Sequence, residues 1–484
     1  MSETEFRSSA EQDSAQSNAG EPGSYRELLH VALPLIISSG SLSVMSAVDR
    51  MMLAGHSADA LAAVTPASML HWTIVCIPLG TILYANTFIS QYDGAGRTSR
   101  LTASLFQAIW LAVISGILLM LVTPWTHTVL SMTGHEAGVV AEETIYFNTL
   151  CSGSSVLLLA MALSCFFSGR RQTQVVMYVN LTSTVLNFGL NYLLIFGHGP
   201  FPEMGIRGAA VATVAARFFD IAAYVVLMKR ANRSGSFPFR QCWQIDRTLL
   251  RKYLKFGLPS GLHYFVDNSG FTVFLLIVGS LSRDALAATN LAFSVNGLIF
   301  VPLLGFGTAV QTLVGHHIGA GLQPAVVRTT WNAVRMAVVW TGSAALLLIL
   351  FPAVSLMPFV AFSVDGSAAA ESLQRLLPTA TILLQFVAVY SVFDALAVVF
   401  ASALRGAGDT LFPMLITMFS SWFVMTLPAW WILSSGSATP QRLWLTCTVH
   451  IVFMGTMMLL RYRTGHWKQI HVIDDAGDGI KRPT

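Results

Sequence analysis

The segment Asp59-Ala60-Leu61-Ala62-Ala63 returns as Asp284-Ala285-Leu286-Ala287-Ala288, which is a shift of 225 positions along the chain. Three other landmarks fall on their copies at this shift: Leu33-Pro34 on Leu258-Pro259, Gly80 on Gly305, and Gly94-Ala95-Gly96 on Gly319-Ala320-Gly321. A later pair, Gly169–Thr173 and Gly406–Thr410, aligns at a shift of 237. In a long apolar chain, such a duplication predicts two bundles of like topology facing each other, as in membrane transporters.

The chain is long and strongly apolar. It has 484 residues, of which 54% are hydrophobic and 11% charged, and its mean hydropathy is +0.62. Soluble proteins carry about 25% charged residues. Runs long enough to cross a bilayer, which takes about 20 residues, cover 29–54, 61–91, 101–124, 143–167, 174–196, 206–228, 249–280, 286–318, 326–357, 374–401, 411–433 and 441–461. The sequence therefore predicts an all-α polytopic membrane protein with twelve transmembrane helices in two six-helix lobes.

Basic residues are distributed unevenly between the two alternating sets of connections. One set, together with both ends of the chain, holds 21 of the 28 Lys and Arg residues. Cytoplasmic loops are enriched in Lys and Arg. We therefore expect both termini to lie in the cytoplasm.

The same pattern divides the chain into five segments. They are a disordered cytoplasmic tail (1–28), an N-lobe (29–229), a cytoplasmic linker (230–248), a C-lobe (249–462) and a C-terminal cytoplasmic tail (463–484). We interpret the basic linker as a solvated connection, with binding of anionic lipid headgroups as the alternative. No cleaved signal peptide is indicated at the beginning of the chain. The five scattered cysteines show no disulfide framework or metal-binding spacing.

Three Gly-Ala-Gly turns, at 94–96, 319–321 and 406–408, fall on the predicted cytoplasmic side. Glycine allows a tight turn to adopt a positive φ. The strand that precedes a nucleotide-binding loop is missing. We therefore interpret the turns as structural, and Pro34, Pro66, Pro259 and Pro302 as kink points within spans.

Acidic residues inside predicted spans are the strongest indication of function. Asp49, Asp267 and Asp394 lie well inside spans, where each charge costs about 2.5–3.5 kcal/mol on insertion scales. Such residues are retained when they face a wet cavity, pair with a donor or take part in function. Asp220 has Arg217 three residues earlier on the same helix face, so we expect this acid to form a structural pair.

The other three acids suit ion coupling. A partly desolvated carboxyl group can exchange a proton near neutral pH or hold Na⁺, and either event can bias a two-state bundle. The alternative is a structural acid, for which His263, one turn before Asp267, is a sterically possible partner.

Further polar residues lie at helical spacing inside the spans. Asn187 and Asn191 share a helix face, and Tyr390 precedes Asp394 by one turn. Asn268 and Asn296 lie in the seventh and eighth spans. These side chains can orient a carboxylate or ligate an ion, or they can form ordinary interhelical hydrogen bonds.

Several segments, in order, resemble the multidrug and toxic compound extrusion (MATE) family, in its NorM-like branch. They are Leu33-Pro34 with Ala47–Gly55, Gln91–Gly96, Leu186–Tyr192, Phe256–Asp267, and Asp394 with Ala403–Thr410. The resemblance covers residues 29–462. It departs from the family at Asp267, where this branch commonly has Glu, and at Arg50, where a smaller residue is common.

The resemblance implies a two-lobe secondary transporter in a bacterial inner membrane. It implies export of organic cations or drugs in exchange for Na⁺ or H⁺, with no other cofactor. The coupling and substrate-binding residues would be Asp49, Asp267 and Asp394, with Asn187, Asn191 and Tyr390 beside them. We expect Na⁺, if it is the coupling ion, at Asp267 and Asp394. The expected partners are small cationic molecules and the lipid bilayer, without nucleic acid, and the expected state is a monomer.

Two alternatives differ in the chemistry they need. A flippase for a lipid-linked precursor, from the related exporter superfamily, would use cationic residues to hold pyrophosphate, whereas the charges inside these spans are mainly acidic. An enzyme needs a nucleophile and base, or a metal, in one constellation. His316-His317 is the only clustered histidine pair and has no carboxylate companion along the chain. We therefore expect no enzyme activity.

The acids do not follow the repeat. At a shift of 225, Asp49 falls on Phe274 and Asp267 on Leu42, and at a shift of 237 Asp394 falls on Leu157. The duplication therefore accounts for the scaffold, and we expect the chemistry to lie where the halves differ.

Overall fold

The computed structural model describes residues 21–132, 135–233, 235–352, 354–356 and 368–473. Within these ranges the chain is helical and contains no strand, which confirms the predicted fold class. The first half comprises α2 (Tyr25–Ala54), α3 (Ala58–Leu83), α4 (Ala85–Gly94), α5 (Thr98–Met120), η1 (Thr123–Trp125), α6 (Thr126–Ser131), α7 (Ala137–Ser152), α8 (Ser154–Gly169), α9 (Thr173–Phe196) and α10 (Gly205–Ala231). The second comprises α11 (Arg247–Leu281), α12 (Arg283–Gly319), α13 (Gln323–Leu350), α15 (Ala368–Ala407), α16 (Leu411–Phe419), η2 (Ser420–Thr426), α17 (Leu427–Ser434), α18 (Pro440–Arg463) and η3 (His466–Gln469).

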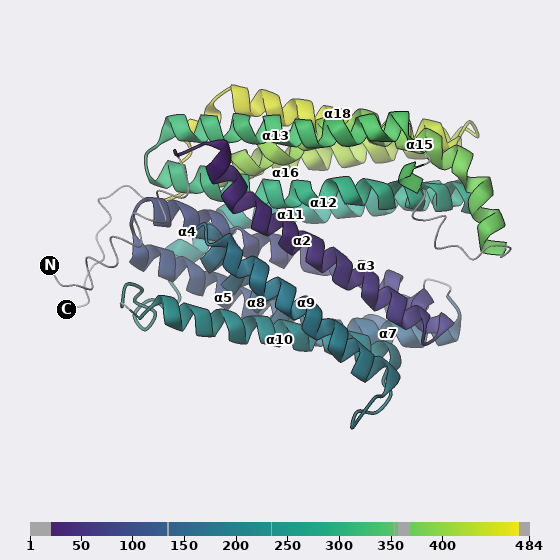
Figure 1. Ribbon diagram of the computed structural model, residues 1–484, viewed down its shortest axis with the longest axis horizontal. Coiled ribbons are helices and arrows are strands. Elements are labelled where there is room, and N and C mark those ends of the chain that lie inside the picture. The colour runs from purple at the N-terminus through teal and green to yellow at the C-terminus, as the bar shows by residue number, and fades with distance from the viewer. Residues whose placement is uncertain (1–20, 133–134, 234, 353, 357–367, 474–484) are drawn as a thin grey trace.

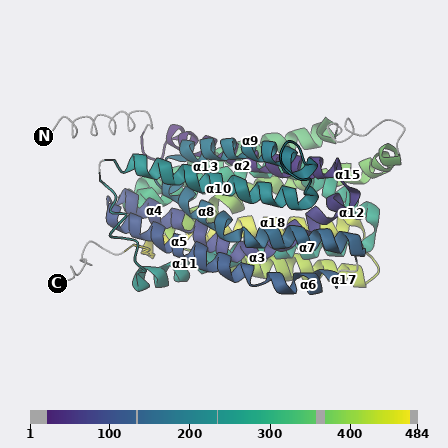
Figure 2. The same cartoon turned by 90° about the horizontal axis from the view of Figure 1, so that it is seen from below.

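These helices give twelve candidate membrane spans in the described chain. Eleven are long and apolar enough by themselves, and the bent pair α7–α8 completes the set. The spans run along the long axis of the molecule, as Figures 1 and 2 show in two perpendicular views. Helices run without interruption through Pro34, Pro66, Pro259 and Pro302.

The fourth span is broken at a glycine that the sequence analysis did not single out. Between α7 and α8 the chain bends by 45° at Gly153. A Cβ at Gly153 would overlap the side chain of Val214 on α10, so the close approach of the two helices requires glycine here. The eleventh span contains a π-helix, η2, between α16 and α17.

The repeated pentapeptide is the first turn of a helix in both halves. Ser57 caps α3 by accepting a hydrogen bond from the backbone N–H of Ala60, and Ser282 caps α12 in the same way at Ala285. Asp59 and Asp284 follow in the first turn, where a carboxylate interacts favourably with the helix dipole. The two copies therefore begin equivalent helices.

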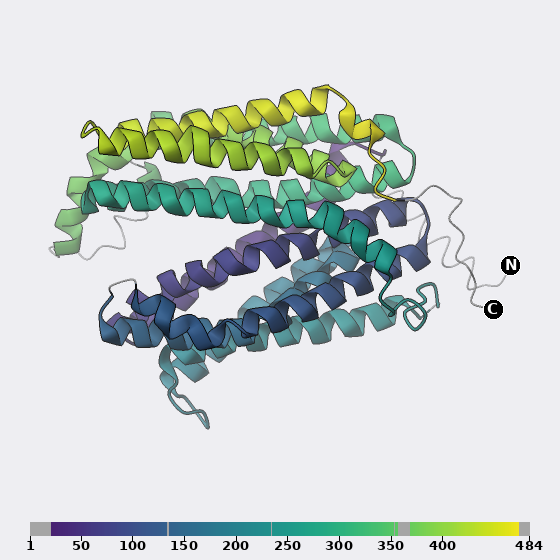
Figure 3. The same ribbon diagram turned by 180° about the vertical axis from the view of Figure 1, so that it is seen from behind.

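Helices α2 and α11 cross from one lobe to the other. The first half of α2, at Leu28, Val31 and Leu35, packs in one core with α12, α13 and α15. In the opposite sense, Leu249 and Tyr253 of α11 pack in a core with α3, α4, α5 and α8. Figure 1 shows α2 running diagonally between the two layers, and Figure 3 shows the matching course of α11 from behind. Each lobe therefore contributes half a helix to the core of the other.

The linker between α10 and α11 packs against the N-lobe, so the interpretation of a solvated connection is wrong for its middle part. Phe237 is 7% exposed and belongs to the same core as α5 and α8. The guanidinium of Arg170 lies 4.6 Å from the centre of the Phe237 ring. Arg100 forms an ion pair with Asp246 at 3.1 Å. Aromatic side chains explain this packing, because their rings give the basic linker a large apolar area that can be buried against the N-lobe.

Candidate functional site

The structure brings Asp49 of α2 together with the two predicted asparagines of α9. Asp49 is 7% exposed, and its carboxylate accepts a hydrogen bond from the Nδ2 of Asn191. Asn191 also donates to the Oδ1 of Asn187 at 3.0 Å. Both asparagines are fully buried. The i, i+4 spacing therefore builds a short polar chain that ends at a buried carboxylate.

Two acids of the N-lobe have an arginine close to them in the sequence, and their surroundings differ. Arg50 is exposed, whereas Asp49 beside it is buried. Arg217 and Asp220 on α10 form an ion pair at 2.8 Å, and both are almost fully buried. This confirms the structural pair that the i, i+3 spacing predicts, and it neutralises a cation inside the span.

The C-lobe acids lie on different helices and, unlike Asp49, accept no hydrogen bond from the described residues. Asp267 of α11 and Asp394 of α15 are half-buried. Neither accepts a hydrogen bond from the described residues, and their charges are within electrostatic range of each other. His263 forms no ion pair with Asp267 within the described chain.

Two polar groups lie near these acids. Tyr390 is 1% exposed, and its hydroxyl has no hydrogen-bond partner among the described residues. The guanidinium of Arg405 is within electrostatic range of Asp267 and donates to the hydroxyl of Ser402 at 3.0 Å. Asn268 instead donates to the hydroxyl of Thr73 on α3 at 3.2 Å, which is an ordinary interhelical contact.

Two hydrogen bonds between the lobes join residues that are equivalent in the sequence repeat. The Nδ2 of Asn86 donates to the hydroxyl of Thr312 at 2.7 Å, and the Nε2 of Gln311 donates to the hydroxyl of Thr87 at 2.8 Å. At a shift of 225, Asn86 falls on Gln311 and Thr87 on Thr312. The two bonds are therefore equivalent, and we call this pair the reciprocal clasp.

Beyond the clasp, the glycine turns bring the backbones of α4 and α12 into contact. A Cβ at Gly94 would overlap the carbonyl of His316, and one at Gly319 would overlap the carbonyl of Gln91. These two contacts are again related by the shift of 225. The turns at 94–96, 319–321 and 406–408 each have positive φ at their last glycine, as predicted.

The histidine pair has carboxylate companions, contrary to the sequence analysis. His316 Nε2 lies 3.6 Å from Asp93, and His317 Nε2 lies 3.3 Å from Glu27. Both acids belong to the other half of the chain, so spacing along the sequence could not reveal them. These contacts lie at the end of the molecule that carries the basic turns, which we call the basic end.

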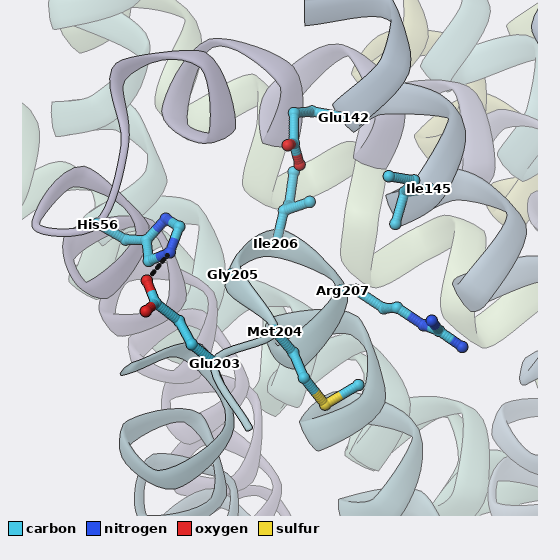
Figure 4. A pocket seen from close by; sticks show the side chains of 8 residues that line it. All are labelled: His56, Glu142, Ile145, Glu203, Met204, Gly205, Ile206 and Arg207. Atoms are coloured by element: carbon cyan, nitrogen blue, oxygen red, sulfur yellow. Dashed lines mark hydrogen bonds and ion pairs between the residues drawn. The ribbon is translucent and has the colours of Figure 1, made fainter. Parts of the chain in front are cut away.

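A cavity of about 500 Å³ lies at the opposite end of the N-lobe, away from all of these residues. Figure 4 shows its lining, in which His56 and Glu203 interact at 3.0 Å. None of the predicted acids lines it. Among the described residues, no group of three or more His, Cys, Asp or Glu side chains is arranged to hold a metal ion.

The family model described as MatE matches residues 34–193 and 259–431, which is more than half of the chain. The chain belongs to the MATE family. It is 25% identical over 453 residues to a probable multidrug resistance protein NorM of Thermotoga maritima, covering 93% of this chain and 94% of that one. It is 28% identical over 448 residues to the multidrug resistance protein PmpM of Pseudomonas aeruginosa, covering 90% of each.

Solved structures of MATE transporters share the fold. An outward-facing multidrug resistance MATE family transporter of the MOP superfamily superposes with a TM-score of 0.82, at 17% identity over 94% of this chain and 98% of that one. A MOP superfamily transporter from Pyrococcus furiosus, described as having a binding pocket of reverse polarity, gives 0.83 at 17% identity over the same shares. These likenesses confirm the two-lobe, twelve-helix fold of this MATE chain.

Several contacts of the site escaped the sequence analysis. They are the partners across the lobes: the reciprocal clasp, the acids beside His316 and His317, and the proximity of Arg405 to Asp267. The repeat itself held the signal for the clasp, because Asn86-Thr87 and Gln311-Thr312 are paired amide and hydroxyl residues at a shift of 225. Nothing in one half alone indicates that the two pairs meet.

Proposed function

We propose that this MATE protein is a secondary active exporter of organic cations or drugs, driven by exchange with Na⁺ or H⁺. The observation that carries the proposal is the pair Asp267 and Asp394, which have no hydrogen-bond donor among the described residues. Two carboxylates within electrostatic range repel each other, so binding one cation or one proton relieves the repulsion. The same negative charge attracts a cationic substrate. The names of the curated relatives, which are multidrug resistance proteins, agree with this role.

The two lobes divide the work in this proposal. Asp267 and Asp394 receive the coupling ion, and the hydroxyl of Tyr390, which has no hydrogen-bond partner among the described residues, offers a further oxygen on α15 for Na⁺. Asp49 is held by Asn191 in the N-lobe. Binding of a proton or cation would neutralise Asp49 and weaken that charge-assisted hydrogen bond. We expect α2 then to shift against α9, which carries Asn187 and Asn191.

Alternating access follows from the position of the lobe contacts. The reciprocal clasp and the ion pairs of His316 and His317 join the lobes in the half toward the basic end, and the helices diverge toward the other end in Figure 3. With the basic end in the cytoplasm of a bacterial inner membrane, this state faces outward. Transport then requires these contacts to open and the far ends to approach.

The experiment uses inside-out vesicles that contain the protein. Uptake of ethidium is followed while Na⁺ and pH gradients are imposed separately, in the wild type and in Asp49→Asn, Asp267→Asn and Asp394→Asn. We expect uptake with one gradient and its loss in the variants, with Asp59→Asn, an exposed acid, as control. Wild-type uptake in all three variants at equal protein level would refute the assignment of the acids. Absence of cation transport together with scrambling of a pyrophosphate lipid would favour the flippase.

A further inference from the structure

Arg335 is an exposed arginine within the span formed by α13. Its guanidinium makes two long hydrogen bonds, to the hydroxyl of Tyr25 at 3.4 Å and to the Oδ1 of Asn332 at 3.5 Å. No carboxylate of the described residues lies within ion-pair distance of it. A guanidinium has five N–H donors, so Arg335 retains donors for a further ligand on the outer surface of the protein.

The contacts at the beginning of α2 place Arg335 relative to the first residues of that helix. The Nδ2 of Asn332 donates to the carbonyl of Gly23 at 2.9 Å, so α2 begins level with Asn332. Arg335 lies three residues farther along α13, about 4.5 Å along the helix axis. Tyr25, which is 44% exposed, lies at the same level. Tyr is enriched at the boundary between headgroups and hydrocarbon, and an arginine there reaches phosphate.

Apolar side chains continue inward from both residues. On α13, Val339 is 71% exposed and Leu346 is 56% exposed, and both share the helix face of Arg335. On α2, Leu29 is 43% exposed and Leu33 is 54% exposed, following Tyr25 at helical spacing. These residues form one surface, in which Arg335 and Tyr25 lie at one end and the two apolar stripes follow along α13 and α2. We call it the α2–α13 surface.

We propose that the α2–α13 surface binds an anionic phospholipid of the cytoplasmic leaflet. Arg335 and Tyr25 donate hydrogen bonds to the lipid phosphate, and the acyl chains lie along the stripes of α13 and α2. Basic groups beside transmembrane helices on the cytoplasmic side recognise anionic headgroups in this way. The exposed Arg26, next to Tyr25 in the sequence, adds positive charge nearby, whereas the charge of Arg328 is paired with Glu21 at 3.4 Å. A free phosphate ion would leave the apolar stripes unused, which is why the surface selects a lipid.

The lipid would brace the junction between the beginning of α2 and α13. Figure 1 shows α2 beginning beside α13, and the first half of α2 packs in the core of the C-lobe with α12, α13 and α15. A lipid bound to both helices therefore strengthens the attachment of this half of α2 to the C-lobe.

The test measures lipid binding to the purified full-length protein in detergent by native mass spectrometry. Phosphatidylglycerol, phosphatidylcholine and glycerol 1-phosphate are titrated separately. We expect phosphatidylglycerol to bind more tightly than phosphatidylcholine, and the difference to fall about five- to tenfold in Arg335→Gln. Tyr25→Phe keeps the ring and loses one donor, so we expect a loss of about two- to threefold.

Arg207→Gln removes an exposed arginine at the opposite end of the molecule and serves as the matched control. Equal melting temperatures in phosphatidylcholine show that the variants are folded. The proposal fails if Arg335→Gln binds phosphatidylglycerol like the wild type, or if phosphatidylcholine binds equally well. Competition by glycerol 1-phosphate at equal concentration would identify a site for free phosphate instead of lipid.

Discussion

At the scale of single residues, the three membrane acids are in different surroundings. Asp49 is buried and bonded to an asparagine, whereas Asp267 and Asp394 are half-buried and have no such donor within the described part of the chain. Sequence analysis placed all three inside spans but could not separate them, because their difference depends on side chains from other helices. The spacing of Arg217 and Asp220 did predict their ion pair, since both partners lie on one helix face.

Asn191→Leu tests the role of the asparagine that holds Asp49. The substitution leaves a buried carboxylate without its donor, which costs about 1–3 kcal/mol. We expect a lower unfolding temperature and weaker transport of cations. Tyr192→Leu, which changes an exposed neighbour on the same helix, is the control. Unchanged thermal unfolding in Asn191→Leu would show that Asp49 does not depend on this bond.

Asp220→Asn tests whether the pair on α10 is structural. It leaves the buried Arg217 uncompensated, and breaking a buried pair costs about 3–5 kcal/mol. The double variant Arg217→Gln with Asp220→Asn removes both charges, so we expect it to recover much of the lost stability. Thermal unfolding in detergent measures both effects. If the double variant is less stable than the single one, the charge of Asp220 has another partner.

At the scale of elements, the duplication specifies the interface as well as the helices. The reciprocal clasp and the crossed glycine contacts join α4 and α12 through residues that the repeat makes equivalent. The apolar pattern predicted these helices well, because burial and membrane span length govern their existence. It did not predict the break at Gly153 or the π-helix η2, since both depend on the packing of neighbouring helices.

Asn86→Ala combined with Gln311→Ala removes both donors of the reciprocal clasp. We expect faster hydrogen–deuterium exchange in α4 and in the last turns of α12, because the clasp favours closure of the basic end. Asn296→Ala, an amide on the same α12, provides the control. Exchange as slow as in the wild type would mean that packing alone holds this end closed.

Gly94→Ala tests the close approach of the turns. Its Cβ would overlap the carbonyl of His316, so α4 and α12 must separate. We expect a lower unfolding temperature and a shift toward the state open at the basic end. Gly189→Ala is the matched control, because nothing lies within 4 Å of its Cβ and the residue is inside a helix. There the substitution should be neutral or stabilising by about 0.5–1 kcal/mol. Equal destabilisation by both variants would contradict the contact.

At the scale of the whole molecule, the lobes meet at the basic end, and in the proposed alternating-access cycle they must part there for substrate to enter. Pairing Asp93→Cys with His316→Cys and joining them with a bifunctional maleimide should stop efflux. Each single cysteine variant, treated alike, controls for reaction at Cys242, which is half-buried. Efflux at the rate of the unreacted protein would show that the basic end need not open.

Composition and the repeat predicted two lobes, but the residues that touch between the two halves could be identified only in the folded structure.

The exchange of half-helices has a consequence for how the protein is made. The core partners of Leu28, Val31 and Leu35 on α2 include residues of α12, α13 and α15. When the first six spans have left the ribosome, this face of α2 has no protein to cover it and must contact lipid or an insertase. Biogenesis is then complete only when the second half arrives, so a polypeptide ending at the linker should be a substrate for membrane quality control rather than a half-transporter.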